Sequence, residues 1–209
     1  MELIFHTYDL PLLHPFTISR ETITVQPTLI VELRDGDISG YGEATTNAYY
    51  DATVEKMCAA LEAVRAEVES SVWETPEQLF DQLDEKLTTC PFAQCALDMA
   101  AHDLWGKKQA QPVWKLWGLN GESNVPSNYT IGIDEIPIMV EKMQEFADWP
   151  IYKIKLGTDH DIEIVKELRQ HTNAAFRVDA NCAWSADETI GNSRELQSLG
   201  VQFIEQPMA

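Results

Sequence analysis

The stretch IYKIKL, residues 151–156, alternates apolar and cationic side chains and therefore predicts a β-strand. Its apolar residues would share one face of the strand, and Lys153 and Lys155 would share the other. Two ammonium groups on one face repel each other, and burying either one is costly without a partner. The stretch indicates either a solvated edge strand, where lysines discourage aggregation, or a strand whose lysines serve chemistry.

Two later stretches have a similar form. RVDAN, residues 177–181, ends a predicted strand at Asp179, and FIEQP, residues 203–207, ends another at Glu205. Lys155 and Asp179 are 24 residues apart, and Asp179 and Glu205 are 26 apart. This period fits one strand plus one helix, so the strands would form a parallel sheet. Because the carboxyl ends of parallel strands meet at one edge, the three polar residues are expected to converge.

Asp179 and Glu205 would repel each other at this edge unless a positive charge lay between them. Oxygen ligands of this kind suit Mg²⁺, which takes few carboxylates and leaves its other positions to water or substrate. The structural alternative is that both carboxylates cap the following helices or pair with Arg177 and nearby lysines. Mutual repulsion would depress the pKa of Lys153 and Lys155, so that one of them could accept a proton near pH 7.

The rest of the chain predicts two kinds of architecture. Residues 1–123 would form an α+β domain, in which a three-stranded antiparallel meander precedes helices, and residues 124–209 would form strand–helix repeats with a parallel sheet. The expected strands of the meander are 2–8, 22–33 and 38–43, and the expected helices cover 51–70, a segment starting at the Thr75–Gln78 capping box, and 92–109, where Met99 stands at core spacing. In the second part a strand is expected at 125–133, a helix at 161–171 and a capping box from Ser185 to Glu188.

Composition excludes several classes of protein. The formal net charge is −19, from 34 acidic and 15 basic residues, which repels nucleic acid and anionic membranes. No apolar run approaches the length of a membrane span, and the N-terminus lacks the pattern of a signal peptide, so a cytoplasmic protein is expected. The four cysteines form no CxxC pair and stand at no zinc-ligand spacing from histidine, which favours free thiols.

The motifs KIK at 153–155, DAN at 179–181 and EQP at 205–207 together resemble the enolase superfamily, in its muconate-lactonising subgroup. Within it they are most similar to dipeptide epimerases of the L-Ala-D/L-Glu epimerase kind. PFTISR at 15–20 and GYGEA at 40–44 look like the capping-domain loops that close over the substrate. The resemblance covers essentially the whole chain, and it implies an α+β capping domain followed by strands 1–4 of a modified TIM barrel.

The resemblance also implies a reaction and roles for residues. Asp179 and Glu205 would be two of three carboxylate ligands of Mg²⁺, with Asn181 as a supporting polar group. Lys155 would remove the α-proton of the C-terminal residue of a dipeptide, giving an enediolate, and Lys153 would lower its pKa. Mg²⁺ would neutralise the charge that develops.

Substrate contacts are implied less specifically. The residues that would line the pocket are Phe16, Arg20, Ile23, Tyr49 and Tyr50. Arg20 is a candidate to meet a glutamate side chain, but Ile23 stands where glutamate-specific relatives carry a further arginine. An apolar C-terminal residue, packed against the two tyrosines, is therefore an equal alternative.

By the family pattern, the third metal ligand and an opposite-face lysine would follow Ala209, so we expect this chain to be the N-terminal portion of a longer enzyme. The 209-residue chain alone is then expected to be inactive and poorly stable, and the full-length enzyme to be a homo-oligomer acting on a small carboxylate substrate. A second chain that supplies the rest, or an inactive remnant, are alternatives. The rival functions are a muconate cycloisomerase or o-succinylbenzoate synthase of the same superfamily, and a non-catalytic binding module.

Overall fold

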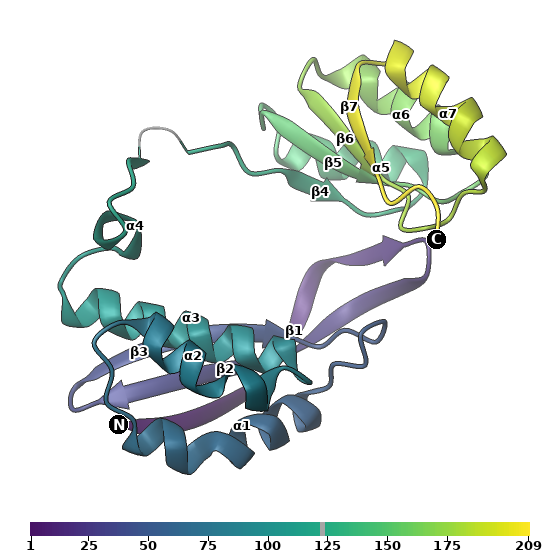
Figure 1. The fold of residues 1–209 in the computed structure, drawn as a ribbon. Helices are drawn as coiled ribbons and strands as arrows, with labels where there is room; N and C mark the ends of the chain where they lie inside the picture. The colour runs from purple at the N-terminus through teal and green to yellow at the C-terminus, as the bar shows by residue number, and fades with distance from the viewer. Residues whose placement is uncertain (122–123) are drawn as a thin grey trace. The chain divides into compact units, whose positions relative to one another are not determined.

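A computed structural model describes residues 1–121 and 124–209 (Figure 1). Contacts between residues divide the chain into two compact units. The first unit contains Met1–Pro11 and Val25–Ser123, and the second contains Leu12–Thr24 and Asn124–Ala209. This division differs from the predicted split after residue 123 in one segment, because the tip of the first hairpin, Leu12–Thr24, belongs to the second unit.

The first unit is built on a three-stranded sheet in the order β1-β2-β3, in which β2 and β3 run antiparallel. The predicted meander is therefore confirmed. The elements are β1 (Glu2–Ile18) and β2 (Glu21–Asp35), whose hairpin ends lie in the second unit, and β3 (Ile38–Thr45), α1 (Val54–Ser70), α2 (Pro76–Leu87), α3 (Pro91–Lys108) and α4 (Val113–Leu116). The first two strands are longer than predicted. Pro11 and Pro15 do not end β1, because an edge strand tolerates residues that lack an N–H group.

β3 packs closely against α3, and two glycines allow this approach. A Cβ atom at Gly40 would lie 2.3 Å from the backbone oxygen of Ala100, and one at Gly42 would lie 2.0 Å from that of Ala96. Any larger residue would push the helix away from the sheet. The stretch GYGEA, which resembled a substrate-covering loop, is thus a strand of the sheet, and its glycines serve packing.

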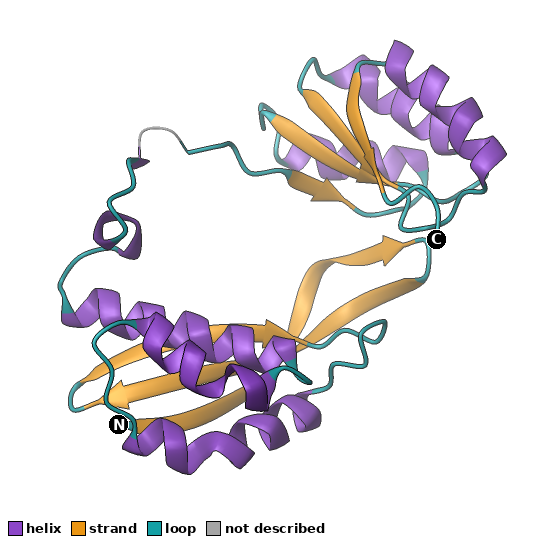
Figure 2. Ribbon diagram, in the orientation of Figure 1, coloured by secondary structure: helices purple, strands orange, loops and turns teal. Residues whose placement is uncertain are grey.

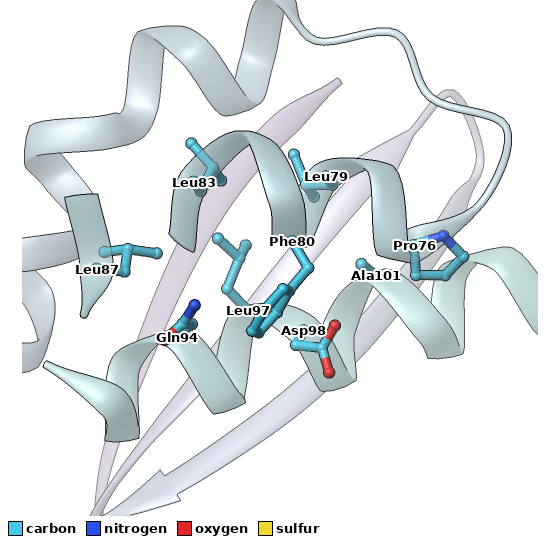
Figure 3. A pocket seen from close by; sticks show the side chains of 9 residues that line it. All are labelled: Pro76, Leu79, Phe80, Leu83, Leu87, Gln94, Leu97, Asp98 and Ala101. Atoms are coloured by element: carbon cyan, nitrogen blue, oxygen red, sulfur yellow. The ribbon is translucent and has the colours of Figure 1, made fainter. Parts of the chain in front are cut away.

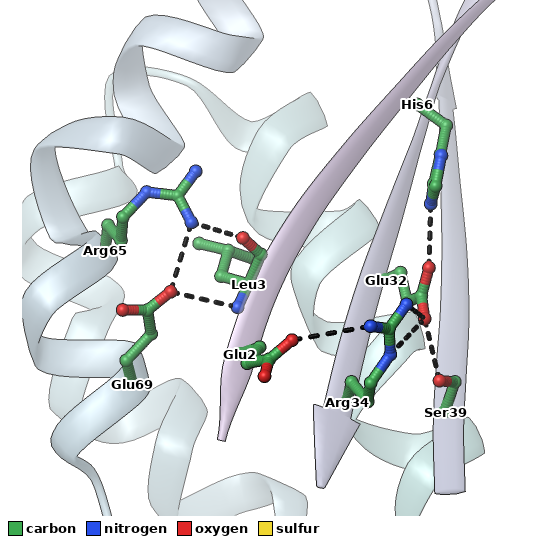
Figure 4. Close-up of polar contacts among 8 residues, drawn as sticks. All are labelled: Glu2, Leu3, His6, Glu32, Arg34, Ser39, Arg65 and Glu69. Atoms are coloured by element: carbon green, nitrogen blue, oxygen red, sulfur yellow. Dashed lines mark hydrogen bonds and ion pairs between the residues drawn. The ribbon is translucent and has the colours of Figure 1, made fainter. Parts of the chain in front are cut away.

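Side chains of α1 bond to the backbone of edge strand β1 at one residue, Leu3 (Figure 4). The Leu3 N–H donates to Glu69 Oε1 at 3.2 Å, and Arg65 donates to the Leu3 carbonyl oxygen. Arg65 also pairs with Glu69 at 3.1 Å. At Leu3 these contacts occupy the backbone groups with which an unpaired strand edge could recruit another chain.

Two local predictions in this unit were wrong. Thr75 precedes α2 but its side chain makes no capping hydrogen bond, and Gln78 Oε1 instead accepts from the Glu74 N–H at 2.9 Å. Met99 was expected in the core but is 40% exposed, because α3 is a helix of small residues whose buried side is formed largely by alanines.

A small cavity lies between α2 and α3 in the first unit (Figure 3). Its volume is about 10 Å³, close to the space of a single water molecule. The residues that line it are Pro76, Leu79, Phe80, Leu83, Leu87, Gln94, Leu97, Asp98 and Ala101. It is a packing defect of the helix pair and too small for a substrate.

The second unit contains a four-stranded parallel sheet in the order β4-β5-β6-β7, alternating with helices (Figure 2). Its elements are β4 (Tyr129–Ile131), α5 (Ile136–Glu145), β5 (Ile151–Lys155), α6 (Asp161–His171), β6 (Ala175–Asp179), α7 (Ala186–Ser198) and β7 (Val201–Glu205). The predicted parallel repeats are confirmed, as is the capping box that Ser185 and Glu188 form at the start of α7. The first strand is shorter than predicted, and Val125 is 89% exposed.

The apolar face of β5 packs under the helices of this unit. Tyr152, Ile154 and Leu156 are buried in one cluster with residues of α5 and α6. The opposite face of the strand carries the two lysines, as the alternation predicts. In the part of the chain that the structure describes, no helix combines the length and apolar character needed to cross a membrane.

Candidate functional site

The polar strand ends of the second unit meet at one edge of its sheet. Lys155 is the register partner of Asp179, and Asp179 is the register partner of Glu205. Parallel pairing brings these ends together because successive strands start and finish at the same sides of the sheet. Residues separated by two complete strand–helix repeats thus become neighbours, as predicted.

Asp179 is the centre of the cluster, with 1% of its surface exposed. Its Oδ2 atom accepts from Lys155 Nζ at 2.8 Å, and its Oδ1 atom accepts from the Asn181 N–H at 2.9 Å. Lys155 Nζ also donates to Asn181 Oδ1 at 3.2 Å. The lysine, the carboxylate and the amide are therefore fixed relative to one another by three mutual hydrogen bonds.

Lys153 joins the two carboxylates. Its Nζ atom lies 3.1 Å from Asp179 Oδ2 and 2.8 Å from Glu205 Oε2. One cationic atom thus reaches an oxygen of each carboxylate, which demonstrates that the two oxygens converge on a single cation-sized position. Hard, anionic oxygens in this arrangement fit Mg²⁺. Among the described residues no group of three or more His, Cys, Asp or Glu is placed to hold a metal ion.

The electrostatics of the cluster correct one prediction. Burial acts to lower the pKa of Lys153, but its contacts with Glu205 and Asp179 outweigh burial and raise the pKa above its usual value. We had expected the neighbouring lysine to depress it. Burial likewise acts to raise the pKa of Asp179, but hydrogen bonds from Lys155, the Asn181 N–H and Lys153 lower it overall. The carboxylates therefore dominate the lysine–lysine repulsion at Lys153.

The loop after β6 has an unusual backbone. Asn181 and Cys182 have φ angles of 46° and 65°, in the left-handed region that most side chains avoid. Backbone hydrogen bonds hold this conformation, because the Cys182 N–H donates to the Gln206 carbonyl at 2.7 Å. The turn directs the Asn181 side chain toward Lys155 and its carbonyl oxygen toward the hairpin tip.

The hairpin tip, residues 12–24, contributes two of the predicted substrate residues to this region. Arg20 Nη1 donates to the Asn181 carbonyl oxygen at 3.1 Å, and Ser19 Oγ donates to the same oxygen at 3.0 Å. Lys155 Nζ lies 5.9 Å from the centre of the Phe16 ring. Phe16 and Arg20 are thus beside the lysine cluster within the second unit.

The other predicted substrate residues are not brought to the cluster by any described contact. Ile23 lies at the start of β2 in the hairpin and is partly buried. Tyr49 and Tyr50 belong to the first unit, where they are 63% and 62% exposed, and Tyr50 lies against the ring of Phe92. Their role in substrate binding stays a prediction.

Two residues near the cluster were missed from the sequence. Asp161 was expected only to begin a helix, and no role was expected for Trp184. In the structure the Trp184 indole N–H donates to Asp161 Oδ2 at 2.7 Å, and both residues are buried. Nothing in the spacing of the two residues indicates this contact, although a Trp after a strand-end motif is a candidate for loop packing.

The arrangement combines a lysine that can exchange a proton with two carboxylates that can share a cation. Such a site is suited to removing a proton next to a carboxylate, because the cation offsets the negative charge that proton removal creates. The hairpin tip supplies an aromatic ring and an arginine next to the lysine.

Comparison with known proteins gives matches over most of the chain. The description "Mandelate racemase / muconate lactonizing enzyme, N-terminal domain" fits residues 2–118, and "Enolase C-terminal domain-like" fits residues 138–209.

Similar proteins include an L-Ala-D/L-amino acid epimerase from Flavobacterium johnsoniae, 54% identical over 100% of this chain and 62% of that protein. An L-Ala-D/L-Glu epimerase from Bacteroides thetaiotaomicron is 36% identical over 100% of this chain and 55% of its own length. A crystal structure of a dipeptide epimerase from Methylococcus capsulatus, complexed with Mg and L-Arg-D-Lys, matches with a TM-score of 0.90 and 30% identity over 100% of this chain and 61% of that one. This chain spans about 60% of the length of such relatives.

Proposed function

Because the chain belongs to the mandelate racemase/muconate lactonizing enzyme family, in the enolase superfamily, we propose that it forms part of a Mg²⁺-dependent dipeptide epimerase. The reaction would invert the α-carbon of the C-terminal residue of a dipeptide. The observation that carries this proposal is the contact of Lys155 with Asp179, next to the two carboxylates that share Lys153. The names of the similar proteins, which are epimerases of dipeptides, support the same substrate class.

Lys155 is the proposed acid/base. Its side chain is 11% exposed, so bulk water competes little for its ammonium group. Asp179 and Asn181 hold that group from one side, which fixes the direction in which a proton leaves or arrives. A base that is already oriented avoids the entropic cost of finding the reacting proton. Lys153 is the proposed companion that keeps the two carboxylates together.

Asp179 and Glu205 are the proposed metal ligands in this chain, and Asn181 supports Asp179 through its backbone N–H. Their convergence on one cationic atom is the reason for assigning them to Mg²⁺. When bound, Mg²⁺ would place positive charge beside the substrate carboxylate, where the enediolate develops its second negative charge.

We assign Phe16 and Arg20 to the wall of the substrate site, because both lie next to Lys155 and Asn181. The aromatic ring would exclude water from the reacting carbon, and the arginine would hold the loop or meet an anionic group. Ile23, Tyr49 and Tyr50 remain proposed pocket residues. We also propose a cytoplasmic location and a homo-oligomer for the full-length protein, and two domains divided near residue 123.

The test of this proposal uses the full-length protein that contains this chain and a panel of L-Ala-L-X dipeptides in D₂O. Epimerisation replaces the α-proton of the C-terminal residue by deuterium, which NMR follows as loss of the α-proton signal. We expect exchange with MgCl₂ and none after removal of metal with EDTA. Absence of exchange on every dipeptide with Mg²⁺ present would contradict the proposal.

The ligand assignment is tested by calorimetric titration of the same protein with MgCl₂. Asp179→Asn should weaken binding by more than the 10- to 100-fold that is typical of a lost supporting contact. Asp134→Asn is the matched control, because Asp134 pairs with the buried Lys142 at 2.9 Å in the same unit but lies outside the cluster. Equal Mg²⁺ affinity of both variants would remove Asp179 from the ligand set.

A further inference from the structure

Asp161 is a buried carboxylate with 3% exposure, and in the part of the chain that the structure describes it forms no ion pair. Its Oδ1 atom accepts from the Thr158 N–H at 2.8 Å and from Thr158 Oγ1 at 2.9 Å, and the Gly157 N–H lies 3.0 Å from both carboxylate oxygens. Trp184 Nε1 donates to Oδ2 at 2.7 Å. Uncharged donors and its place at the start of α6 thus stabilise the carboxylate.

These donors come from two different loops. Gly157 and Thr158 follow β5 and stand two and three residues after Lys155. Trp184 follows β6 and stands three residues after Asn181. A hydrogen bond between Asp161 and Trp184 therefore links the segment that carries the lysine to the segment that carries the carboxylate and amide around it. The loops also touch directly, because a Cβ atom at Gly157 would lie 2.8 Å from Ala183 Cβ.

Trp184 extends the link to a third strand. Its backbone N–H donates to the Pro207 carbonyl at 2.9 Å, two residues after Glu205. The loop after β6 is thus joined to the segment after β7 by its backbone and to the loop after β5 by the Trp184 side chain. The Asp161–Trp184 bond is a side-chain contact between segments whose relative position sets the distance from Lys155 to Asp179 and Asn181.

We propose that Asp161 and Trp184 are positioning residues for the reaction, which set the loop after β5 against the loop after β6 and so direct the Lys155 ammonium group. Neither side chain touches the reacting atoms, and both act through the backbone of Gly157 and of the loop that contains Asn181. This inference rests on the proposed function. Because a displacement of about 1 Å can cost roughly 100-fold in rate, loss of the bond should affect turnover more than substrate binding.

The experiment compares Trp184→Phe with Tyr152→Phe in the full-length protein. Tyr152 is a matched control, because it is a buried aromatic residue of the same core whose hydroxyl donates one hydrogen bond, to the Phe146 carbonyl at 2.6 Å. Both variants delete one donor and keep a ring. Trp184→Phe should lower kcat by about 10- to 100-fold and change KM by less than about 3-fold, while Tyr152→Phe keeps kcat even if its melting temperature falls as far.

Asp161→Asn provides a second measurement that does not depend on the ring. The asparagine keeps an oxygen that accepts from Gly157 and Thr158. The atom that faces the indole N–H becomes an NH₂ group, or an uncharged oxygen if the amide turns over. If the two residues act as one unit, the double variant should lose no more in kcat than the worse single variant. Thermal unfolding identifies the temperature at which every variant is folded, and the kinetics are measured there.

The outcomes separate this inference from the proposed function. Suppose that the wild-type protein is active. If Trp184→Phe and Tyr152→Phe then have the same kcat, or if the effects of Asp161→Asn and Trp184→Phe on kcat are simply additive, the positioning role is overturned and the epimerase assignment stays intact. A wild-type protein that exchanges no α-proton overturns the proposed function and the inference together. Loss of kcat confined to Trp184→Phe and Asp161→Asn, without additivity, supports the positioning role.

Discussion

Glu32 in the first unit and Asp179 in the second are both buried carboxylates, but they are satisfied in different ways. Glu32 accepts from Arg34 at 2.8 Å and from Ser39 at 2.7 Å, and His6 Nε2 lies 2.7 Å from its other oxygen (Figure 4). These partners stand on the same sheet as Glu32, on β1, β2 and β3. All of these partners of Glu32 are therefore side chains of neighbouring strands in one sheet.

Asp179 instead pairs with two lysines of the neighbouring strand, and a second carboxylate stands beside it. Glu205 has a side chain that is 41% exposed, whereas the Asp179 side chain is 2% exposed. A network at the carboxyl ends of parallel strands is open on one side, where a ligand can reach it. The comparison teaches that burial and low pKa alone do not identify a site: both acids have a lowered pKa, and only one stands at an open strand end beside a second acid.

The strongest test of this difference exchanges one cation in each network for methionine. Lys155→Met in the full-length protein should lower the rate of α-proton exchange by roughly 100- to 10,000-fold, because it removes the proposed general base. Arg34→Met removes a cation from Glu32 and should leave the exchange rate unchanged, although the protein becomes less stable. NMR in D₂O measures both rates, and an equal loss in the two variants would mean that the effect comes from stability.

The second test concerns stability. A substitution in the Glu32 network should destabilise the fold and leave the exchange rate unchanged. Glu32→Gln should lower the free energy of unfolding by about 3 kcal/mol, because it removes the negative charge that pairs with Arg34 and one of the two acceptor oxygens of the buried network. Urea unfolding followed by circular dichroism measures this value. The exchange rate of the folded variant should equal that of the wild type, and a lower rate at full folding would assign the Glu32 network a part in the reaction.

The third test uses pH. Burial acts to raise the pKa of Glu32, but hydrogen bonds from Ser39, His6 and Arg34 lower it from 4.5 to about 2. A group with a lower pKa in the folded state stabilises the fold above its unfolded pKa and loses this contribution as the pH falls. The contribution of about 3 kcal/mol should therefore be complete above pH 4.5 and disappear by about pH 2.

Urea unfolding of the wild type and Glu32→Gln as a function of pH checks this expectation. The difference in unfolding free energy between the two proteins should shrink as the pH falls from 4.5 to 2. A difference that stays constant over this range would mean that Glu32 is not the group responsible.

The smallest expected effect is at the edge of the first network. Ser39→Ala removes one of the hydrogen bonds to Glu32 and should cost about 1.5 kcal/mol of unfolding free energy, the lower end of what a single hydrogen bond to a charged group contributes. It should also raise the pKa of Glu32, so that acid destabilisation begins at a higher pH. A change in stability without any change in pH dependence would mean that the Ser39 hydroxyl matters for packing only.

Much of the fold was predictable because it depends on local periodicity. The alternation in IYKIKL predicted β5 and its buried apolar face, and the regular return of strand ends predicted a parallel sheet. The capping box at Ser185 was predicted from four residues, since all of its contacts are local. The Thr75 box failed although its pattern is similar, because Gln78 bonds to the residue before the cap instead.

The strand ends were also sufficient to predict that Lys155, Asp179 and Glu205 converge, because parallel topology turns distance along the chain into proximity. The direction in which the pKa of Lys153 is shifted was not predictable in this way. The sequence displays the two lysines side by side, but only the folded chain places Glu205 and Asp179 within 3.1 Å of Lys153, where attraction exceeds repulsion.

The sequence by itself thus determined the order of strands and helices, the parallel sheet and the polar residues at the carboxyl edge of that sheet, since each depends on side-chain type and spacing. Tertiary structure alone decided that the hairpin tip reaches Asn181 and that Trp184 donates to Asp161. Both contacts join separate segments of the chain through one or two hydrogen bonds. Such contacts leave no periodic signal, because their geometry is set by how complete loops pack and not by the residues that precede or follow them.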